Sequence, residues 1–260
     1  MQPCCLAVLV LCGSQPYADT FLGSVILNEY ERLIMNPFPP RRRIVLMRHG
    51  EVNYFENGKP VPTPEARLNE DGRKQAQAAQ QMLLDVSFDR VVATGLSRTM
   101  ETARIVLGEC DLPIEVVPEL QEILGGRLTH LAPDDLRQTF LDSMTHNVSA
   151  HSRFLNGEQF GSFSARIIAA FQALLETSGW RSMLIVAHGA VNRAILAHIL
   201  HAPIEAMGHI EQDACCVNLI DIDDRGYGIV RLLNFTPYNQ YKQDMELTTM
   251  ERYFLKFPEK

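Results

Sequence analysis

Short apolar runs alternate with longer amphipathic stretches along most of this sequence of 260 residues. Ile44–Met47 is a continuous apolar run, which is the pattern of a strand in a sheet that is covered on both faces. Runs of similar length recur further along the chain. Together they predict strands at Ile44–Met47, Arg90–Ala93, Ile114–Val117, Met183–Ala187, Val217–Ile222 and Gly228–Leu233.

The stretches between these strands have the period of a helix. Glu70–Leu84 carries an apolar stripe, made of Ala76, Ala79, Met82 and Leu83. Further helices are predicted at Ser97–Leu107, Phe160–Leu175 and Ala190–Leu200. Strands that alternate with helices imply an α/β fold, which we expect to be a three-layer α/β/α sandwich with a largely parallel central sheet.

The first forty residues do not share this pattern. Leu6–Leu11 is apolar but too short to span a bilayer, and no Lys or Arg precedes it as in a signal peptide. We expect a cytosolic extension or a misplaced start codon. Pro37, Pro39 and Pro40 then form a stiff, non-helical lead-in. We therefore predict an N-terminal extension over residues 1–40, of undefined role, and a single domain over residues 41–260.

Composition narrows the class of protein. Hydrophobic residues make up 46% and charged residues 21%, as in folded globular proteins. The net charge of -7 argues against a nucleic-acid partner, which requires a basic surface. The six cysteines include two adjacent pairs, a poor framework for disulfides, so a reduced, cytoplasmic location is favoured. The histidines are not spaced with carboxylates or thiols as metal ligands, and we expect neither a metal nor a cofactor.

Chemically suitable side chains follow three of the predicted strands. Arg48 and His49 follow the first strand, Arg98 begins the helix after the second, and His188 follows Met183–Ala187. The carboxyl ends of parallel strands form the ligand-binding edge of such sheets. Arginine neutralises phosphate charge in two-pronged form, and a neutral imidazole is a nucleophile near pH 7. Each residue taken singly is more often structural, but the ordered set predicts phosphoryl transfer.

The segments around these residues resemble the histidine phosphatase superfamily, which is also called the phosphoglycerate mutase-like family. The resemblance extends from about Ile44 to Leu233 and includes the family's Arg-His-Gly-Glu signature. The matching motifs are Leu46–Glu51, Leu68–Ala76, Ser97–Ala103, Glu119–Glu122 and Val186–Gly189. The resemblance implies a phosphoglycerate mutase-like fold and a metal-independent phosphatase that works through a phosphohistidine.

Carried over to this chain, the resemblance makes His49 the nucleophile. Arg48, Arg98 and His188 then bind the phosphate, and Glu122 is the general acid and base. Glu119 is the rival for that last role, because the motif around the two carboxylates is short. Glu122 is favoured because Gly125 and Gly126 follow it, as suits a loop near a ligand.

Two other functions stay open at this stage. A cofactor-dependent phosphoglycerate mutase shares the whole phosphate pocket, but relatives of that kind carry tyrosine and lysine in the segment after the acid. Residues 125–159 contain neither, and offer instead a core or a lid made of Phe140, Met144, Phe154 and Phe160. A non-catalytic interaction module that keeps the fold is the second alternative. A secreted, disulfide-rich acid phosphatase does not fit the cysteine pattern.

The expected partner is a small-molecule phosphomonoester, with a phosphoprotein not excluded. We expect no nucleic-acid or membrane partner, and a monomer or homodimer.

Overall fold

The computed structural model describes residues 41–56, 59–61, 65–126, 133–144 and 148–256, and every structural statement below concerns these residues. Arg41–Lys260 forms one compact unit. The extension predicted over residues 1–40 lies outside the described residues, so the domain boundary at residue 41 stays a prediction. No helix among the described residues is long and apolar enough to cross a lipid bilayer.

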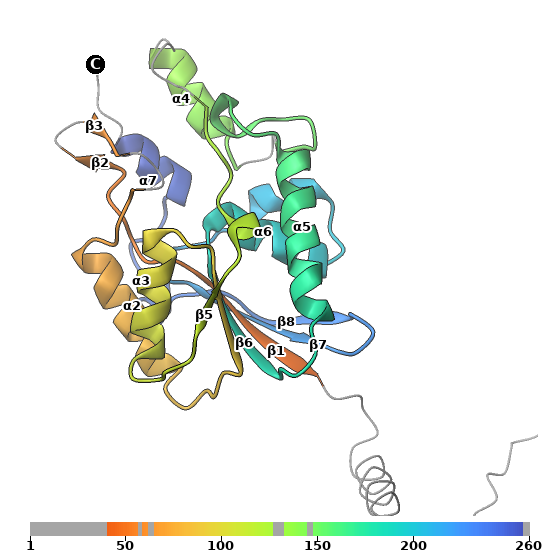
Figure 1. Cartoon of the computed structure of the whole chain (residues 1–260). Coiled ribbons are helices and arrows are strands. Elements are labelled where there is room, and N and C mark those ends of the chain that lie inside the picture. The colour runs from red at the N-terminus through yellow and green to blue at the C-terminus, as the bar shows by residue number, and fades with distance from the viewer. Residues whose placement is uncertain (1–40, 57–58, 62–64, 127–132, 145–147, 257–260) are drawn as a thin grey trace, which may run out of the picture. The chain divides into compact units, whose positions relative to one another are not determined.

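A six-stranded sheet runs through the middle of this unit (Figure 1). Its order is β5-β4-β6-β1-β7-β8, in which β5, β4, β6 and β1 are parallel neighbours and β7 and β8 join antiparallel. The largely parallel sheet and all six predicted strands are therefore confirmed. The observed bounds are β1 (Arg42–Arg48), β4 (Arg90–Ala93), β5 (Ile114–Val116), β6 (Ser182–Ala187), β7 (Val217–Ile222) and β8 (Gly228–Phe235).

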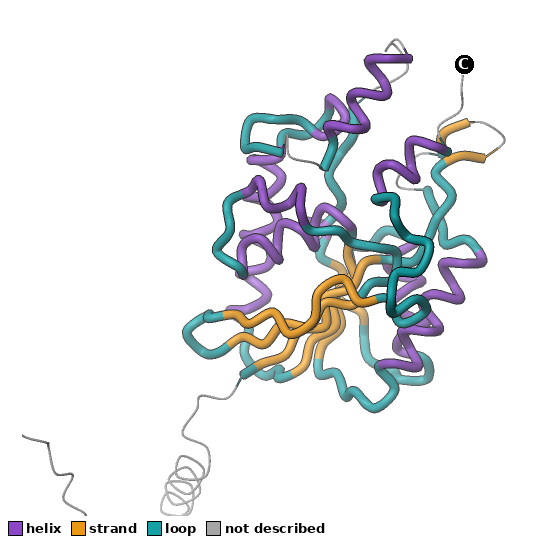
Figure 2. The backbone as a smooth tube through the Cα atoms, turned by 180° about the vertical axis from the view of Figure 1, so that it is seen from behind, coloured by secondary structure: helices purple, strands orange, loops and turns teal. Residues whose placement is uncertain are grey.

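Helices cover both faces of the sheet, as Figure 1 and the view from behind in Figure 2 show. On one side lie α2 (Glu70–Met82) and α3 (Ser97–Leu107), and on the other α5 (Phe160–Glu176) and α6 (Gly189–Ile199). The three-layer sandwich predicted from the alternation of strands and helices is confirmed. The four predicted helices agree with these bounds to within two residues.

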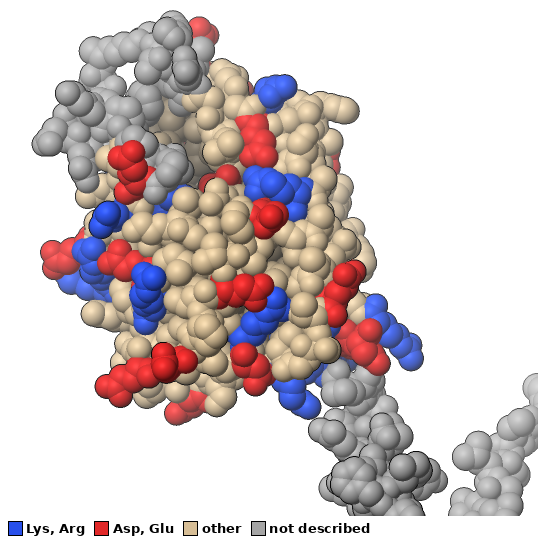
Figure 3. Space-filling view, in the orientation of Figure 1, with Lys and Arg blue, Asp and Glu red and all other residues tan. Residues whose placement is uncertain are grey.

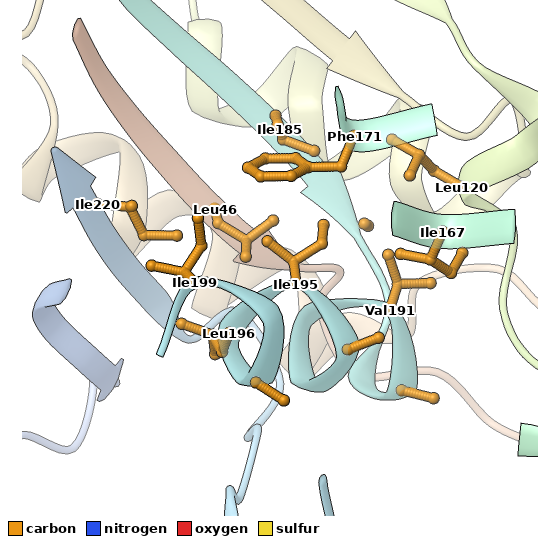
Figure 4. Packing of buried hydrophobic residues seen from close by; sticks show 14 of the residues in the cluster. Leu46, Leu120, Ile167, Phe171, Ile185, Val191, Ile195, Leu196, Ile199 and Ile220 are labelled. Carbon is orange, nitrogen blue, oxygen red and sulfur yellow. The ribbon is translucent and has the colours of Figure 1, made fainter. Parts of the chain in front are cut away.

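The apolar run in β1 is continuous because its side chains enter two different cores. Ile44 and Leu46 belong to the cluster under α5 and α6, whereas Val45 and Met47 belong to the cluster under α2 and α3. Alternation of side chains across a strand produces this division. Figure 4 shows the first cluster, where α6 turns Val191, Ile195 and Ile199 toward the sheet.

One residue of the predicted stripe on α2 was wrong. Ala76, Ala79 and Leu83 are buried at spacings of three and four residues, but Met82 is 41% exposed. At about 100° per residue, Met82 lies outside the face that the other three share.

Several elements were not predicted. They are the hairpin of β2 (Phe55–Glu56) and β3 (Lys59–Pro60), the helices α4 (Pro133–Asp142) and α7 (Thr249–Leu255), and the short 3-10 turns η1 (Pro118–Leu120), η2 (Phe154–Asn156) and η3 (Ile204–His209). Phe140 of α4 is buried against the rings of Tyr253 and Phe254, with centroid distances of 5.3 and 5.6 Å. The two helices α4 and α7 thereby pack together.

Candidate active site

The carboxyl ends of β4, β6 and β1 lie side by side, because these strands are parallel neighbours. His49 follows β1 and His188 follows β6, and their ring centroids are 5.2 Å apart. Arg98, at the start of α3, donates from Nε to His49 Nε2 over 3.2 Å. The structure thus brings together residues that stand up to 139 positions apart in the sequence, since 188 minus 49 is 139.

The backbone of His49 is held on both sides. Its N–H donates to the carbonyl of Ala187 over 3.0 Å, and its carbonyl accepts from Cys215 N over 3.1 Å. The ring nitrogen Nδ1 is 2.7 Å from the carbonyl oxygen of Gly50, which accepts only if Nδ1 carries the hydrogen. Nε2 then holds the lone pair. In this tautomer Nε2 is the ring nitrogen whose lone pair a nucleophilic histidine would use.

The charge of His49 is controlled by its surroundings. Burial, and after it the positive charges of Arg98 and Arg48, hold the pKa of His49 well below its ordinary value. The ring is therefore neutral at pH 7. A neutral ring is required for nucleophilic attack.

Two glycines bring the first helix against the loop that follows β1. A Cβ on Gly72 would clash with the carbonyl oxygen of Glu51, and one on Gly50 would clash with the carbonyl oxygen of Gly72. Asn69 caps α2 by accepting from Gly72 N over 2.8 Å, and its own N–H donates to Glu51 O over 3.0 Å. The Leu68–Ala76 motif therefore has a structural basis: its cap and its glycine hold the loop that carries His49.

Arg48 is buried at the end of β1. Its Nη1 donates to the carbonyl oxygen of Gln212 over 2.7 Å and to Thr249 Oγ1 over 3.2 Å. Its Nε is buried and has no hydrogen-bond partner among the described residues. A buried donor of this kind costs free energy unless an acceptor is bound to it.

Arg98 is fully buried in the first turn of α3. A cation there opposes the helix dipole, so its position favours an anion nearby. Thr102, one turn later, links α3 to the loop that follows β1: its hydroxyl donates to Arg98 O over 2.7 Å and accepts from Gly50 N over 3.1 Å. Thr102 therefore fixes the distance between the arginine and the histidine.

His188 is completely buried and is held by a chain of hydroxyl groups. Its Nε2 lies 2.9 Å from Thr94 Oγ1, which lies 3.0 Å from Thr99 Oγ1. Thr99 donates to the carbonyl oxygen of Leu96 over 2.8 Å. In this direction of donation Nε2 carries the hydrogen, and Nδ1 has no partner among the described residues. Burial, then the charges of Arg98, His49 and Arg48, hold the pKa of His188 well below its ordinary value.

The carboxylate of Glu122 lies beside the two arginines. Its Oε1 accepts from Ile123 N over 3.0 Å and its Oε2 from Ala190 N over 3.3 Å. Burial raises the pKa of this carboxyl, although these hydrogen bonds and the charges of Arg48 and Arg98 act in the opposite direction. A raised pKa suits a group that gives a proton away near neutral pH.

The rival carboxylate is in a different environment. Glu119 is exposed in η1, and its backbone carbonyl oxygen accepts a hydrogen bond from Arg166 over 2.5 Å. Of the two carboxylates, only Glu122 interacts electrostatically with the buried arginines. The geometry therefore favours Glu122 over Glu119.

The four side chains that were expected to form a core or a lid are mainly core residues, because Met144 and Phe160 belong to the core cluster and Phe154 packs against it. Phe160 is in the core cluster, and Phe140 is buried under α7. Met144 and Phe154 line a small cavity of about 50 Å³ that Arg48 also lines.

Several residues that lie at the site were not predicted from the sequence. Thr94 directly follows a predicted strand, so its place in the sequence was a usable signal. Thr249 lies in a helix that begins with Thr248 and Glu251, a capping box that can be recognised from sequence. Thr102 lies within the Ser97–Ala103 motif, whereas Gln212 had no signal of this kind, because its contacts exist only in the folded chain. Among the described residues there is no cluster of three or more histidine, cysteine, aspartate or glutamate side chains suited to a metal ion.

Comparison with known proteins identifies the class. The family model described as the histidine phosphatase superfamily (branch 1) matches residues 44–235. The chain belongs to this family, and the resemblance seen in its motifs is confirmed. It is similar to the adenosylcobalamin/alpha-ribazole phosphatase of Escherichia coli (strain K12), with 34% identity over 197 residues that cover 74% of this chain and 95% of that protein.

Solved structures agree with this result. The crystal structure of the alpha-ribazole phosphatase from Shigella flexneri superposes with a TM-score of 0.60 at 33% identity, covering 74% of this chain and 96% of that one.

A probable phosphoglycerate mutase of Yersinia pestis (strain Pestoides F) is 24% identical over 185 residues, which cover 70% of this chain and 86% of that protein. The fold is phosphoglycerate mutase-like, and the chain is a phosphatase of this family.

Proposed function

We propose that this phosphatase hydrolyses small phosphomonoesters through a phosphohistidine formed at His49. The observation that carries the proposal is the neutral Nε2 of His49, which lies 3.2 Å from the Arg98 guanidinium. Nucleophile and anion-binding group thus share one buried location. Arg48, with its buried Nε, is the second charge that binds the phosphate.

In the first half-reaction, Nε2 of His49 attacks phosphorus and the bond to the leaving oxygen breaks. Glu122 gives its proton to that oxygen. Arg48 and Arg98 stabilise the charge on the remaining oxygens. A phosphate dianion beside His188 favours the imidazolium form of that ring, which donates from Nδ1 to the phosphate and from Nε2 to Thr94.

In the second half-reaction, water replaces the histidine. Glu122, now ionised, takes a proton from the attacking water, the bond between phosphorus and Nε2 breaks, and phosphate leaves. Glu122 regains its proton and His49 is again neutral. Two guanidinium groups supply the positive charge that other phosphatases obtain from metal ions, so the proposed reaction needs neither a metal nor a cofactor.

A mutase is the less favoured alternative. Tyrosine and lysine are absent from residues 125–159. Tyr253 and Lys256, near the C-terminus, nevertheless line the cavity beside His49, which the sequence argument did not foresee. Lys256 is paired with Glu51 over 3.1 Å, so its charge is already balanced by a carboxylate of the chain itself. With 3-phosphoglycerate and 2,3-bisphosphoglycerate we expect negligible isomerisation.

The curated relatives suggest which ester to test first. Because the most similar proteins described above are named alpha-ribazole phosphatases, we propose alpha-ribazole phosphate as the first candidate substrate. The unpaired cysteines Cys110, Cys215 and Cys216 support a reduced, cytoplasmic location. Acidic and basic side chains are interspersed on the face in Figure 3, which supports a small-molecule partner rather than a nucleic acid.

The decisive experiment is His49→Ala with a phosphate-release assay and rapid acid or alkaline quenching of the enzyme on labelled ester. We expect the wild type to trap an acid-labile, alkali-stable phosphoenzyme and the variant to lose both the phosphoenzyme and turnover, while its circular dichroism spectrum is unchanged. Arg48→Ala and Arg98→Ala should each lower kcat/KM by about a hundred-fold or more. Near wild-type turnover of His49→Ala would exclude the proposed nucleophile.

A further inference from the structure

The chain continues beyond the family match, which ends at residue 235. The described part beyond it comprises residues 236–256, here called the C-terminal segment, and it includes α7. Thr248 caps α7, because its side chain accepts from the backbone N–H of Glu251 over 3.2 Å. Thr249, the first residue of the helix, is not needed for the cap, so its hydroxyl is free to contact the rest of the chain.

The hydroxyl of Thr249 contacts the arginine of the family signature. Arg48 Nη1 donates to Thr249 Oγ1 over 3.2 Å and to the carbonyl oxygen of Gln212 over 2.7 Å. Thr249 Oγ1 donates in turn to Glu211 Oε1 over 2.7 Å, and Arg252 Nη2 approaches it at the longer distance of 3.4 Å. A hydroxyl has one hydrogen and two lone pairs, so it can donate to the carboxylate and accept from Arg48 at the same time.

Glu211 is itself held by a buried cation. Arg193, on α6, is only 4% exposed, and its Nη2 lies 3.1 Å from Glu211 Oε2, while its Nη1 donates to the carbonyl oxygen of Met207 over 3.2 Å. Burial by itself would raise the pKa of Glu211, but the charge of Arg193 and the hydrogen bond from Thr249 outweigh it and hold the pKa below its ordinary value. Glu211 is therefore an ionised acceptor with a fixed position.

These contacts hold one nitrogen of the Arg48 guanidinium and leave one edge of it for a ligand. Nη1 has two acceptors, whereas the buried Nε has none among the described residues. Nε lies beside Gly189, where a Cβ would be in contact with both Arg48 Nε and Glu122 Oε2. Nε and Nη2 form the edge whose parallel N–H groups match two phosphate oxygens. Fixing Nη1 therefore fixes the direction of the edge that can bind phosphate.

The C-terminal segment has other attachments that do not involve Arg48. The carboxylate of Asp213 pairs with Arg252 over 2.8 Å and with Lys242 over 2.9 Å. Removal of the Thr249 hydroxyl leaves both of these pairs in place. An effect of Thr249 on Arg48 can therefore be separated by experiment from a general role in attaching the segment.

We propose that Thr249 is a positioning residue for Arg48: through its hydroxyl, Glu211 and the C-terminal segment hold the guanidinium with its Nε edge toward the phosphate. The inference rests on the proposed function, because it assumes that Arg48 binds the phosphate that His49 attacks. Without the hydroxyl, the carbonyl oxygen of Gln212 is the remaining acceptor for Nη1, and the guanidinium gains freedom to rotate. A segment outside the family match thus supports a residue of the family signature.

Thr249→Val removes the hydroxyl and keeps the branched shape of the side chain. We expect kcat/KM for 4-nitrophenyl phosphate to fall about ten-fold, and the inhibition constant of inorganic phosphate to rise by a similar factor, because a misplaced charge stabilises the phosphate less well. Thr249→Ser keeps the hydroxyl and should restore most of the activity. Thr249→Ala, which removes the hydroxyl and reduces bulk, provides the same test if valine is not accommodated.

Thr236→Val is the matched control, because it makes the same change in the same segment. Thr236 is fully buried, and its hydroxyl donates to the carbonyl oxygen of Asn239 over 2.5 Å, away from Arg48. Its kcat/KM should equal that of the wild type. An equal loss of activity in Thr236→Val and Thr249→Val would indicate general loosening of the segment and would overturn the proposal.

A double-mutant cycle with Arg48→Ala gives a result that a merely structural role would not produce. Once the guanidinium is absent, Thr249→Val should lower kcat/KM no further, since there is nothing left to position. The same fold-loss in both backgrounds would overturn the proposal, as would a Thr249→Ser variant no more active than Thr249→Val. Full activity of Arg48→Ala by itself would instead contradict the phosphate-binding role given to Arg48 in the proposed function.

Discussion

Replacing Glu122 by glutamine tests the assignment of the general acid most directly. Glutamine has nearly the shape of glutamate but cannot give a proton to the leaving oxygen. One of its two terminal atoms remains an acceptor for the backbone N–H of Ile123 or Ala190. Loss of the other hydrogen bond should cost about 0.5–1.5 kcal/mol of folding stability, so the variant is expected to fold.

The expected effect depends on the leaving group. General acid catalysis contributes about 10²–10⁴ in rate, which is about 3–5 kcal/mol at the transition state. An alkyl ester needs this proton because an alkoxide leaves poorly, whereas the nitrophenolate of 4-nitrophenyl phosphate leaves without it. Glu122→Gln should therefore slow phosphoenzyme formation from the alkyl ester by about a hundred-fold or more and barely change it for the aryl ester.

Rapid-quench measurement of the first turnover separates this step from hydrolysis of the phosphohistidine, which Glu122 also assists. Because the pKa of Glu122 is raised, the first-turnover rate of the wild type on an alkyl ester should fall as pH rises through that pKa. The glutamine variant should lack this fall. Glu119→Gln is the control at an exposed position.

Two results would refute the role given to Glu122. One is an equal loss of rate on both esters, which would indicate damage to the pocket rather than loss of a proton donor. The other is a Glu119→Gln variant that reproduces the selective loss.

Two further predictions concern the metal and the pH. Activity should survive dialysis against EDTA, because Arg48 and Arg98 neutralise the phosphate; a loss that only a divalent cation restores would contradict this. In the folded chain, burial holds the pKa values of His49 and His188 well below the ordinary histidine value of about 6.5. Below about pH 6.5 the unfolded chain binds protons that the folded chain does not, so their contribution to stability is complete above that pH and declines as pH falls toward the folded pKa values. The free energy of unfolding should fall by up to about 1.4 kcal/mol per pH unit for each histidine. Urea denaturation between pH 7 and 5.5, in a Glu122→Gln background, measures this slope. A His188→Asn variant should show a smaller slope.

The regular elements could be predicted from the sequence because local patterns encode them. The continuous apolar run of β1 follows from a strand that is buried on both faces, and the stripe of α2 from a helix that packs on one side. The parallel direction of the strands was sufficient to predict that His49 and His188 lie at one edge of the sheet. Arg98 was found from its place after the second predicted strand, whereas only the family motif supplied Glu122, whose chemistry alone would not have distinguished it from a solvated charge.

The tertiary structure decided what depends on contacts between distant parts of the chain. Glu122 differs from Glu119 because of burial beside Arg48 and Arg98, and two nearby carboxylates in a short motif do not reveal which of them is enclosed. The pKa values of His49 and His188 are low for the same reason, since they result from desolvation and from charges brought near by folding.

The C-terminal segment, residues 236–256, is the clearest example of what the sequence pattern did not reveal. The capping box at Thr248 could be recognised from the sequence, but α7 is short. The position of the segment over the loop that follows β1 depends on Asp213, Glu211 and Glu51. These partners are 38 to 205 residues away along the chain. Hydropathy and local propensity describe which segments are helical, whereas pairing over such distances is determined only when the core has formed.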